Sequence, residues 1–432
     1  MPDLSAFRAA FDRDGLFLPG AGLIWLRRLR EQALARAEEH GLPTRRDEDW
    51  RNTDLSALTA HPWRAPAPRA LPADLPLMPE AHRLVFLDGR AVDDGLPQPP
   101  LPGGVVLTTL RQALAEDPIS LARWLTRHPA RGEHALFDLD TALMQDGMVL
   151  RVPTGVVLER PVQLVSVSTG GSGATWLRHL VVLEDGAAAE VVEDRVGTGV
   201  GPDLHAAVTW LSLGEEAELL HSRLQVGGPS SYDLAFFHVE QAARSVLHHQ
   251  ILALGGALGR TELRVTQRGE GAEADLAGLA LGRDAQVQDF LTWIDHEAPG
   301  GVSRQAFRAV LGGRARSVFN GRVRVARDAQ RIDADQSSRA LLLSEGASAH
   351  HRPQLEILAD DVRCTHGAAI GQLDEEALFY LRARGLDEAA ARRLLLTAFT
   401  AELTERFPEG PVAERVEALV QGWLQAAHEE VA

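Results

Sequence analysis

The chain has 432 residues, with 44 Lys and Arg against 60 Asp and Glu, and carries a formal net charge of −16. This acidic balance excludes a general nucleic-acid binder, because neutralising phosphates requires a surplus of basic residues. Hydrophobic residues make up 45% and charged residues 24%, which is the composition of a globular protein that can bury a core.

The single cysteine, Cys364, excludes an internal disulfide and any zinc or cluster site built from several thiolates of this chain. A lone thiol suits a reducing cytosol. The N-terminus carries charged residues where a secretory signal needs an apolar stretch, and no apolar run approaches the ~18 to 20 residues that span a bilayer. We therefore expect a soluble, cytoplasmic protein that does not bind membranes.

Residues 1–135 are predicted to form an N-terminal helical and Pro-rich region. Leucines at helical spacing and the Ala/Glu-rich stretch 31–40 indicate a helix that ends at Gly41. Ten of the 23 prolines lie in 62–102, which favours loops there, interrupted by one strand candidate at 84–87. Another helix is predicted over 110–128.

Residues 136–373 are predicted to form a β-helix core, since short β-branched runs alternate with turns of small residues. The turns are expected at 185–187, 214–217, 240–242, 255–257, 271–272, 283–285, 312–315, 327–329 and 345–347. Their steps cluster near 12 to 18 residues or near 26 to 29, the longer steps being interpreted as missed turns. This period indicates a stacked β-solenoid, because a β-sandwich seldom extends over so many residues.

Residues 374–432 are predicted to form a C-terminal helical domain. Asp374 can cap a first helix that ends at Gly385, and Asp387 can cap a second. A third helix is expected over 412–427.

The best candidate for chemistry is Cys364 with His366. Residues i and i+2 of a strand face the same way, so the two side chains project together while Thr365 faces the other side. A thiolate and an imidazole suit iron or zinc, but they supply only two ligands. The ligand set would have to be completed by another chain, by His350 and His351, or by sulfide and solvent. The alternative is that Cys364 is a small buried hydrophobe and His366 a hydrogen-bonded residue at a strand end.

Other polar motifs are weaker candidates. The adjacent pairs 248–249 and 350–351 are histidines that point to opposite faces of a strand, so we expect exposed or edge positions. The triplet 295–297 is expected in a solvated loop. Asp333 and Asp335 could place two carboxylates on one face, as a β-helix enzyme acting on a sugar or acidic substrate would need, although nearby arginines are expected to pair with them.

Several segments together resemble the SufB/SufD family of iron–sulfur cluster assembly proteins. They are RRDEDW (45–50), DG (146–147), VPTGV (152–156), FNGRV (319–323), QSS (336–338), LLLS (341–344), PQLE (353–356), DVRCTHGA (361–368) and LFYLRARG (378–385). They are spread over nearly the whole chain. The length, the segment 45–50 and the single cysteine make the chain more similar to SufD than to SufB proteins.

This resemblance implies a fold, partners and roles for individual residues. The fold would be a right-handed parallel β-helix, and the partners SufB and two copies of the ATPase SufC, which engages the C-terminal helices. His366 would be the histidine associated with cluster assembly together with a SufB cysteine, and Cys364 its neighbour. The residues implied in partner binding are Phe379, Tyr380, Leu381, Arg382 and Arg384.

The function expected from this resemblance is that of a non-catalytic scaffold subunit. A transient iron–sulfur cluster would be shared with SufB, with none bound by this chain alone. ATP hydrolysis by SufC would move the C-terminal helices and change the interface around Cys364 and His366. Two alternatives stay open, namely a β-helix enzyme and a homodimeric adaptor without metal.

Overall fold

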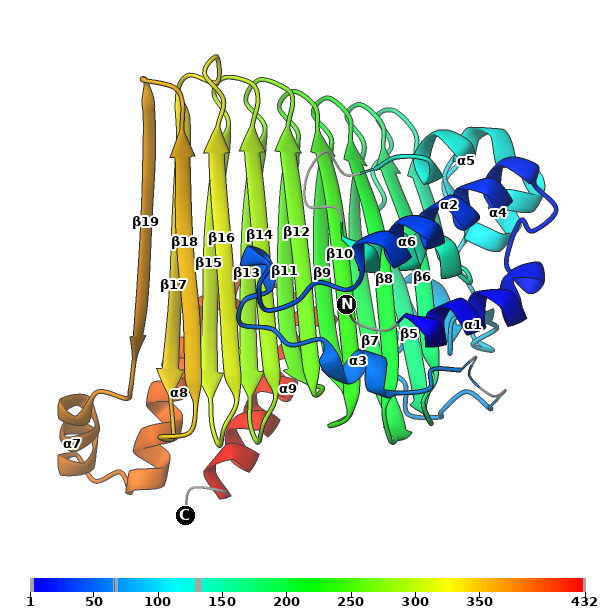
Figure 1. Ribbon diagram of the computed structural model, residues 1–432. Helices are drawn as coiled ribbons and strands as arrows, with labels where there is room; N and C mark the ends of the chain where they lie inside the picture. The colour runs from blue at the N-terminus through cyan, green and yellow to red at the C-terminus, as the bar shows by residue number, and fades with distance from the viewer. Residues whose placement is uncertain (1–3, 65, 67–68, 129–133, 430–432) are drawn as a thin grey trace.

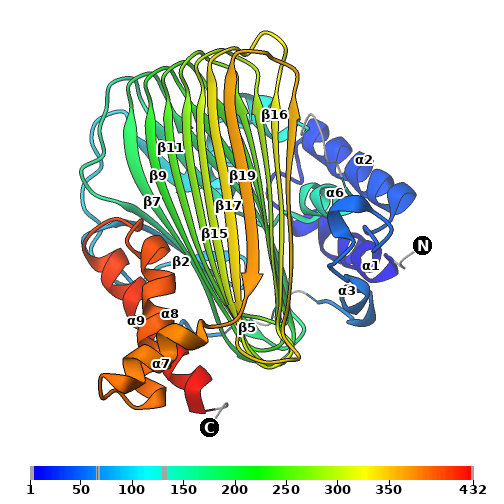
Figure 2. The same ribbon diagram turned by 90° about the vertical axis from the view of Figure 1, so that its left-hand side faces the viewer.

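The structure is a computed structural model that describes residues 4–64, 66, 69–128 and 134–429. Long strands stand side by side in a solenoid, with helices against its two outer faces (Figure 1). The N-terminal helices cover one face and the C-terminal helices the other (Figure 2). The mainly β fold with a parallel β-solenoid core, expected from the sequence, is confirmed.

Two sheets form the solenoid. Within the described residues, one has the order β19-β17-β15-β13-β11-β9-β7-β5-β1-β2 and the other β18-β16-β14-β12-β10-β8-β6-β4-β3. The strands are β1 (His82–Leu87), β2 (Arg90–Val92), β3 (Val106–Thr109), β4 (Met148–Val152), β5 (Val162–Gly170), β6 (Ala174–Leu183), β7 (Ala188–Val200), β8 (Asp203–Leu213), β9 (Glu218–Gly227), β10 (Ser231–Gln241), β11 (Val246–Gly255), β12 (Leu258–Gln267), β13 (Glu273–Gly282), β14 (Val287–His296), β15 (Val302–Leu311), β16 (Arg316–Val325), β17 (Ile332–Leu342), β18 (Ser348–Ile357) and β19 (Val362–Gly371). From β4 onward the chain alternates between the sheets, so each strand pairs in parallel with the strand two places along.

The turn period follows from this path. Val246 pairs with Glu273, 27 residues on, and Glu273 pairs with Val302, 29 residues on. The longer steps are therefore full rungs, and the shorter ones lead from one sheet to the other. Gly313 shows why small residues recur in the turns, because its φ is +60° and an added Cβ would lie 2.9 Å from Asp284 N.

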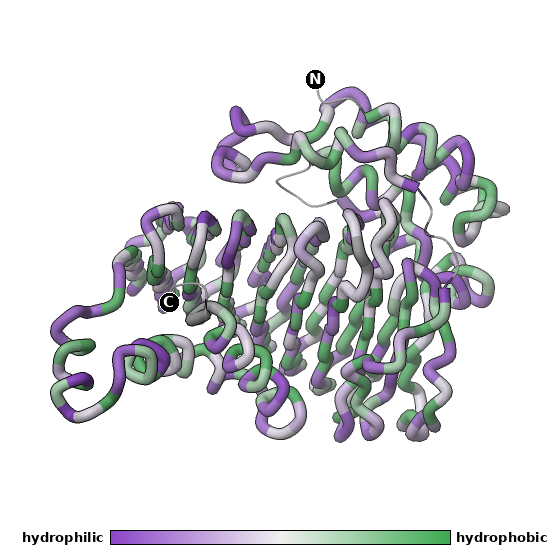
Figure 3. Tube along the Cα trace, turned by 90° about the horizontal axis from the view of Figure 1, so that it is seen from below, coloured by the Kyte–Doolittle hydropathy of each residue, from purple (hydrophilic) through white to green (hydrophobic). Residues whose placement is uncertain are grey.

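Side chains alternate between the interior of the solenoid and its outer faces. Figure 3 shows hydrophobic and hydrophilic residues interspersed along the strands. The interior holds a long apolar cluster that runs from Phe86 through Phe237 and Phe307 to Ala347, and a smaller one near its open end around Val323 and Ala334. The outer faces are apolar as well where helices cover them. Each sheet is therefore buried on both sides over much of its area, as parallel sheets usually are.

The N-terminal region packs against the outer face of the sheet that contains β8, β10, β12 and β14. Its helices are α1 (Ser5–Asp14), α2 (Ile24–His40), α3 (Ser56–Ala60), α4 (Leu110–Glu116), α5 (Pro118–Leu125) and α6 (Ala135–Leu143), with 3-10 turns η1 (Gly15–Phe17) and η2 (Glu48–Trp50). The predicted helix 110–128 is two helices, because Pro118 lacks the N–H that a continuous helix needs. Asp117 caps the second by accepting from Ser120 N.

A buried ion pair fastens this region to the sheet. The ring of Trp50 lies 3.6 Å from the guanidinium carbon of Arg260, and that guanidinium binds Asp289. Thr53 donates to the same carboxylate from the N-terminal side. Trp50 and Thr53 are thus part of a structural anchor.

The C-terminal helices are α7 (Glu375–Ala383), α8 (Glu388–Thr404) and α9 (Pro411–Glu429). Asp374 and Asp387 cap α7 and α8, as predicted. Apolar residues of α8 and α9 pack on the outer face of the sheet that contains β9, β11, β13 and β15. Arg415 of α9 also pairs with the buried Asp194 of β7. In the described part of the chain no helix has the length and apolar character needed to cross a membrane.

Candidate functional site

Cys364 and His366 lie on β19, the last strand of its sheet. Cys364 pairs in register with Ala334 of β17, and His366 with Gln336. Ala334 and Gln336 are buried in the interior of the solenoid. Cys364 and His366 therefore lie on the interior side of the last rung, where no further rung covers them among the described residues. Cys364 is half-buried and His366 is exposed.

The thiol of Cys364 lies against an apolar cluster that includes Val323, Ile332 and Ala334. Burial raises the pKa of the Cys364 thiol, and the carboxylate of Asp333 raises it further. The thiol form is therefore favoured in this chain at neutral pH. A cation bound at the sulfur would reverse this preference, since a metal-ligating thiol loses its proton.

The neighbours of His366 do not complete a ligand set. His351 faces the interior from β18, where its Nε2 lies 3.3 Å from Ser317 Oγ and burial lowers its pKa to about 4. His350 is exposed. No group of three or more His, Cys, Asp or Glu side chains in the described ranges could hold a metal ion. Within the described residues, Cys364 and His366 therefore offer two metal ligands and gain no third one from their neighbours.

The predicted partner-binding residues lie on α7 and just after it. Phe379 is 74% exposed and Tyr380 57% exposed, whereas Leu381 is half-buried. The Arg384 guanidinium carbon lies 5.0 Å from the Tyr380 ring centroid, and Arg382 pairs with Glu388 at 3.6 Å. Figure 1 shows α7 at the end of the solenoid, directly after β19.

Three expectations about polar motifs are wrong in part. His249 is fully buried and stacks on His221 with ring centroids 4.6 Å apart. His296 ends β14 in the interior, with Nε2 3.0 Å from Ser303 Oγ, and is not in a solvated loop. Asp333 pairs with Arg304 rather than with the arginines nearest in sequence. His249 and Asp333 thus contact residues about one rung away, whereas the partner of His296 lies across the next turn, at the start of β15.

The sequence reasoning missed a buried charge cluster inside the solenoid. Asp233 binds Arg195 Nε at 3.1 Å and Arg223 Nη2 at 2.5 Å, and His205 Nδ1 lies 3.2 Å away. Arg223 also binds Glu193 at 2.9 Å. Burial alone would raise the pKa of Asp233, but the cations around it lower that pKa overall.

A sequence signal for this cluster exists. Charged or polar residues recur at i and i+2 in β7, β8 and β9, as Glu193 with Arg195, Asp203 with His205 and His221 with Arg223. This spacing places both members of each pair on one face of the strand. Because these faces are inside a solenoid, the pairs must satisfy one another.

The chain matches two family models. Residues 166–399 match the model described as "SUF system FeS cluster assembly, SufBD core domain". Residues 16–164 match the model of the SufBD protein N-terminal region. The core match begins within β5 and ends within α8.

Curated relatives cover most of the chain. An iron–sulfur cluster assembly SufBD family protein of Synechocystis is 31% identical over 88% of this chain and 87% of its own length. The iron–sulfur cluster assembly protein SufD of Escherichia coli is 30% identical over 90% of this chain and 91% of its own length. SufD of Bacillus subtilis is 26% identical over 92% and 93%.

Proposed function

The chain belongs to the SufBD family of iron–sulfur cluster assembly proteins, and we propose that it is a non-catalytic scaffold subunit that pairs with SufB and the ATPase SufC. The cluster is the cargo of this complex. In this proposal Cys364 and His366 contribute a partial ligand set, and SufB supplies the rest. The chain alone binds no cluster.

The observation that carries this proposal is the open last rung. β18 and β19 end their two sheets, and His366 to Gly371 are exposed along β19. An edge strand offers unpaired N–H and C=O groups to another chain. Because Cys364 and His366 lie on the interior side of that edge, a protein that covers the rung also covers them. A shared site at an interface follows naturally from this position.

The ligand chemistry supports a shared site. Two protein ligands are only half of the four that a [2Fe–2S] or [4Fe–4S] cluster takes from protein. The raised pKa of Cys364 disfavours the free thiolate, so its ligand form requires an arriving cation. A second chain can bring both the remaining ligands and the cluster components.

The C-terminal helices are the proposed contact with SufC. α7 exposes Phe379 and Tyr380, two large aromatic side chains of the kind that anchor protein interfaces. The hydrophobic core of the solenoid does not use them. ATP-driven movement of α7 would act on the neighbouring β19, because only residues 372–374 separate them.

Co-expression with SufB and SufC of the same organism tests the proposal. We expect the three proteins to co-purify, with iron and acid-labile sulfide appearing only when all are present. His366→Ala should abolish cluster formation while the complex still assembles. His40→Ala, an exposed histidine at the end of α2, is the matched control. Unchanged iron and sulfide in His366→Ala would contradict the ligand role.

A further inference from the structure

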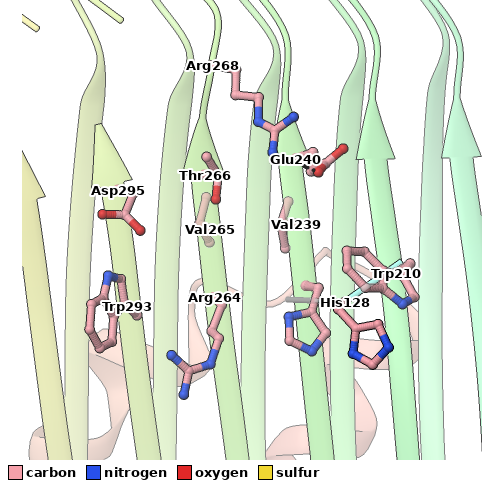
Figure 4. Close-up of a pocket in the computed structure, with 11 residues that line it drawn as sticks. His128, Trp210, Val239, Glu240, Arg264, Val265, Thr266, Arg268, Trp293 and Asp295 are labelled. Atoms are coloured by element: carbon pink, nitrogen blue, oxygen red, sulfur yellow. Dashed lines mark ion pairs between the residues drawn. The ribbon is translucent and has the colours of Figure 1, made fainter. Parts of the chain in front are cut away.

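Two contacts show how neighbouring strands of the solenoid satisfy polar side chains. On the outer face, Arg268, which follows β12, binds Glu240 of β10 at 3.1 Å, where both residues line a pocket (Figure 4). In the interior, Thr292 of β14 donates to Gln305 Oε1 of β15 at 2.6 Å. This second contact joins the two sheets across the interior, and both of its side chains are 2% exposed.

Gln336 occupies the place of Gln305 one rung nearer the open end. It pairs in register with Gln305 of β15 on one side and with His366 of β19 on the other. Gln336 is 1% exposed, yet neither its Oε1 nor its Nε2 has a hydrogen-bond partner among the described residues. A buried amide without partners lowers the stability of a fold, so its presence at this position calls for a physical reason.

The opposite sheet explains why Gln336 lacks a partner across the interior. Thr292 pairs in register with Gly321 of β16, which pairs with Pro353 of β18. Gly321 therefore stands where Thr292 stands one rung earlier, and it has no hydroxyl to donate. An added Cβ at Gly321 would collide with Gln336 Nε2. The glycine thus makes room for the amide and at the same time leaves it unpaired.

The last rung offers the amide a different neighbour. Pro353 occupies the corresponding place on β18, and its side chain has no hydrogen-bonding group. His366 is the next side chain in the row of Gln336, about 4.8 Å along the sheet, a spacing at which stacked amides form hydrogen-bonded ladders. The two side chains share no hydrogen bond in the free chain, where His366 is exposed to water.

We propose that Gln336 is a positioning residue for the shared site. Once a partner covers the last rung, Gln336 Oε1 accepts a hydrogen bond from the ring N–H of His366 and fixes the direction of the imidazole. This inference rests on the proposed function, in which His366 is a ligand. A histidine that binds a metal through one ring nitrogen keeps an N–H on the other, and an acceptor for that N–H holds the ring in place.

Urea unfolding of the free chain gives the first test, which does not depend on any partner. Gln336→Met removes the amide and keeps the length of the side chain, so it should raise the urea midpoint, because no hydrogen bond is lost. Gln305→Met is the matched control one rung deeper in the same row. It should lower the midpoint, because the Thr292 hydroxyl loses its acceptor. A lower midpoint in Gln336→Met would show that its amide already supports the fold, and would overturn the inference.

Electron paramagnetic resonance of the reduced cluster in the complex with SufB and SufC gives the second test. The parent should show a nitrogen hyperfine coupling that His366→Ala removes. Gln336→Met should assemble the same complex but shift or lose this coupling, and Gln336→Glu, which restores an acceptor, should recover it. Gln305→Met should keep the parent coupling.

The outcomes separate this inference from the function on which it rests. An unchanged coupling in Gln336→Met, with the coupling still lost in His366→Ala, would overturn the role of Gln336 and leave the ligand role of His366 intact. A parent complex without the coupling, or one in which His366→Ala leaves it unchanged, would contradict the ligand role itself and the inference with it.

Discussion

The interior of the solenoid between β7 and β11 and its open rung at β19 use the same strand positions in opposite ways. Inside, polar side chains such as Asp233 and Arg223 are fully buried and bind one another. At β19, Cys364 and His366 continue the same interior-facing rows, but no rung within the described residues covers them. A row of interior positions is therefore structural where another rung covers it, and it is available for chemistry where the row ends.

His249 and His366 lie in the same row of paired interior positions, one in the covered part and one at the open end. His249 pairs with Leu276, which pairs with Gln305, then Gln336, then His366. His249 is fully buried, whereas His366 is exposed. The difference between them is their distance from the open end.

The largest expected effect comes from breaking the interior cluster. Asp233→Ala leaves Arg195 and Arg223 buried without their shared carboxylate, and should lower the free energy of unfolding by about 3–5 kcal/mol. Urea unfolding measures this. Asp335→Ala on the exposed face of β17 is the matched control, with an expected change within about 0.5 kcal/mol. Similar losses in both would remove the distinction between the two regions.

The two histidines of one row sharpen the comparison. His249→Ala opens a cavity beside His221 and Phe237 and should cost about 2–4 kcal/mol. His366→Ala should change the free energy of unfolding by less than about 0.5 kcal/mol, because its side chain is exposed. A loss of several kcal/mol in His366→Ala would show that this residue supports the fold.

The buried histidines should make the free energy of unfolding depend on pH, and the expected change per pH unit is smaller for each histidine than the losses above. Burial lowers the pKa of His179 and of His221 to about 3. Below about pH 6.5 the unfolded chain binds protons that the folded chain does not, so stability is lost as pH falls from there toward 3.

Each such histidine contributes up to about 1.4 kcal/mol per pH unit in that range. His221→Phe should reduce the slope, as measured by urea unfolding at several pH values. An unchanged slope in His221→Phe would contradict the burial of a neutral ring.

Local patterns in the sequence predicted much of the fold. The turns near Gly186, Gly271 and Gly313 lie between strands as expected, and Asp374 caps its helix. These features depend on residues close together in the chain. The i and i+2 spacing of Cys364 and His366 likewise predicted that they share a face.

What could not be predicted depends on contacts between rungs. The partners of Asp233 lie 10 to 38 residues away in sequence, and their contacts follow from the register and the rung length. His249 and His296 looked exposed because adjacent polar residues commonly are, whereas the solenoid buries every second side chain. The end of the β-helix core at residue 373 was predicted, but the openness of the last rung required the three-dimensional path, since the sequence does not show whether the following helices cover that rung.

The most direct test of the shared-site account is hydrogen–deuterium exchange of β19 in the chain alone and in its complex with SufB and SufC. The amides of β19 that do not pair with β17 are predicted to exchange slowly only in the complex. β2, the other edge strand of the same sheet, should exchange equally in both states. Equal exchange of β19 with and without the partners would contradict the claim that the open rung is their interface.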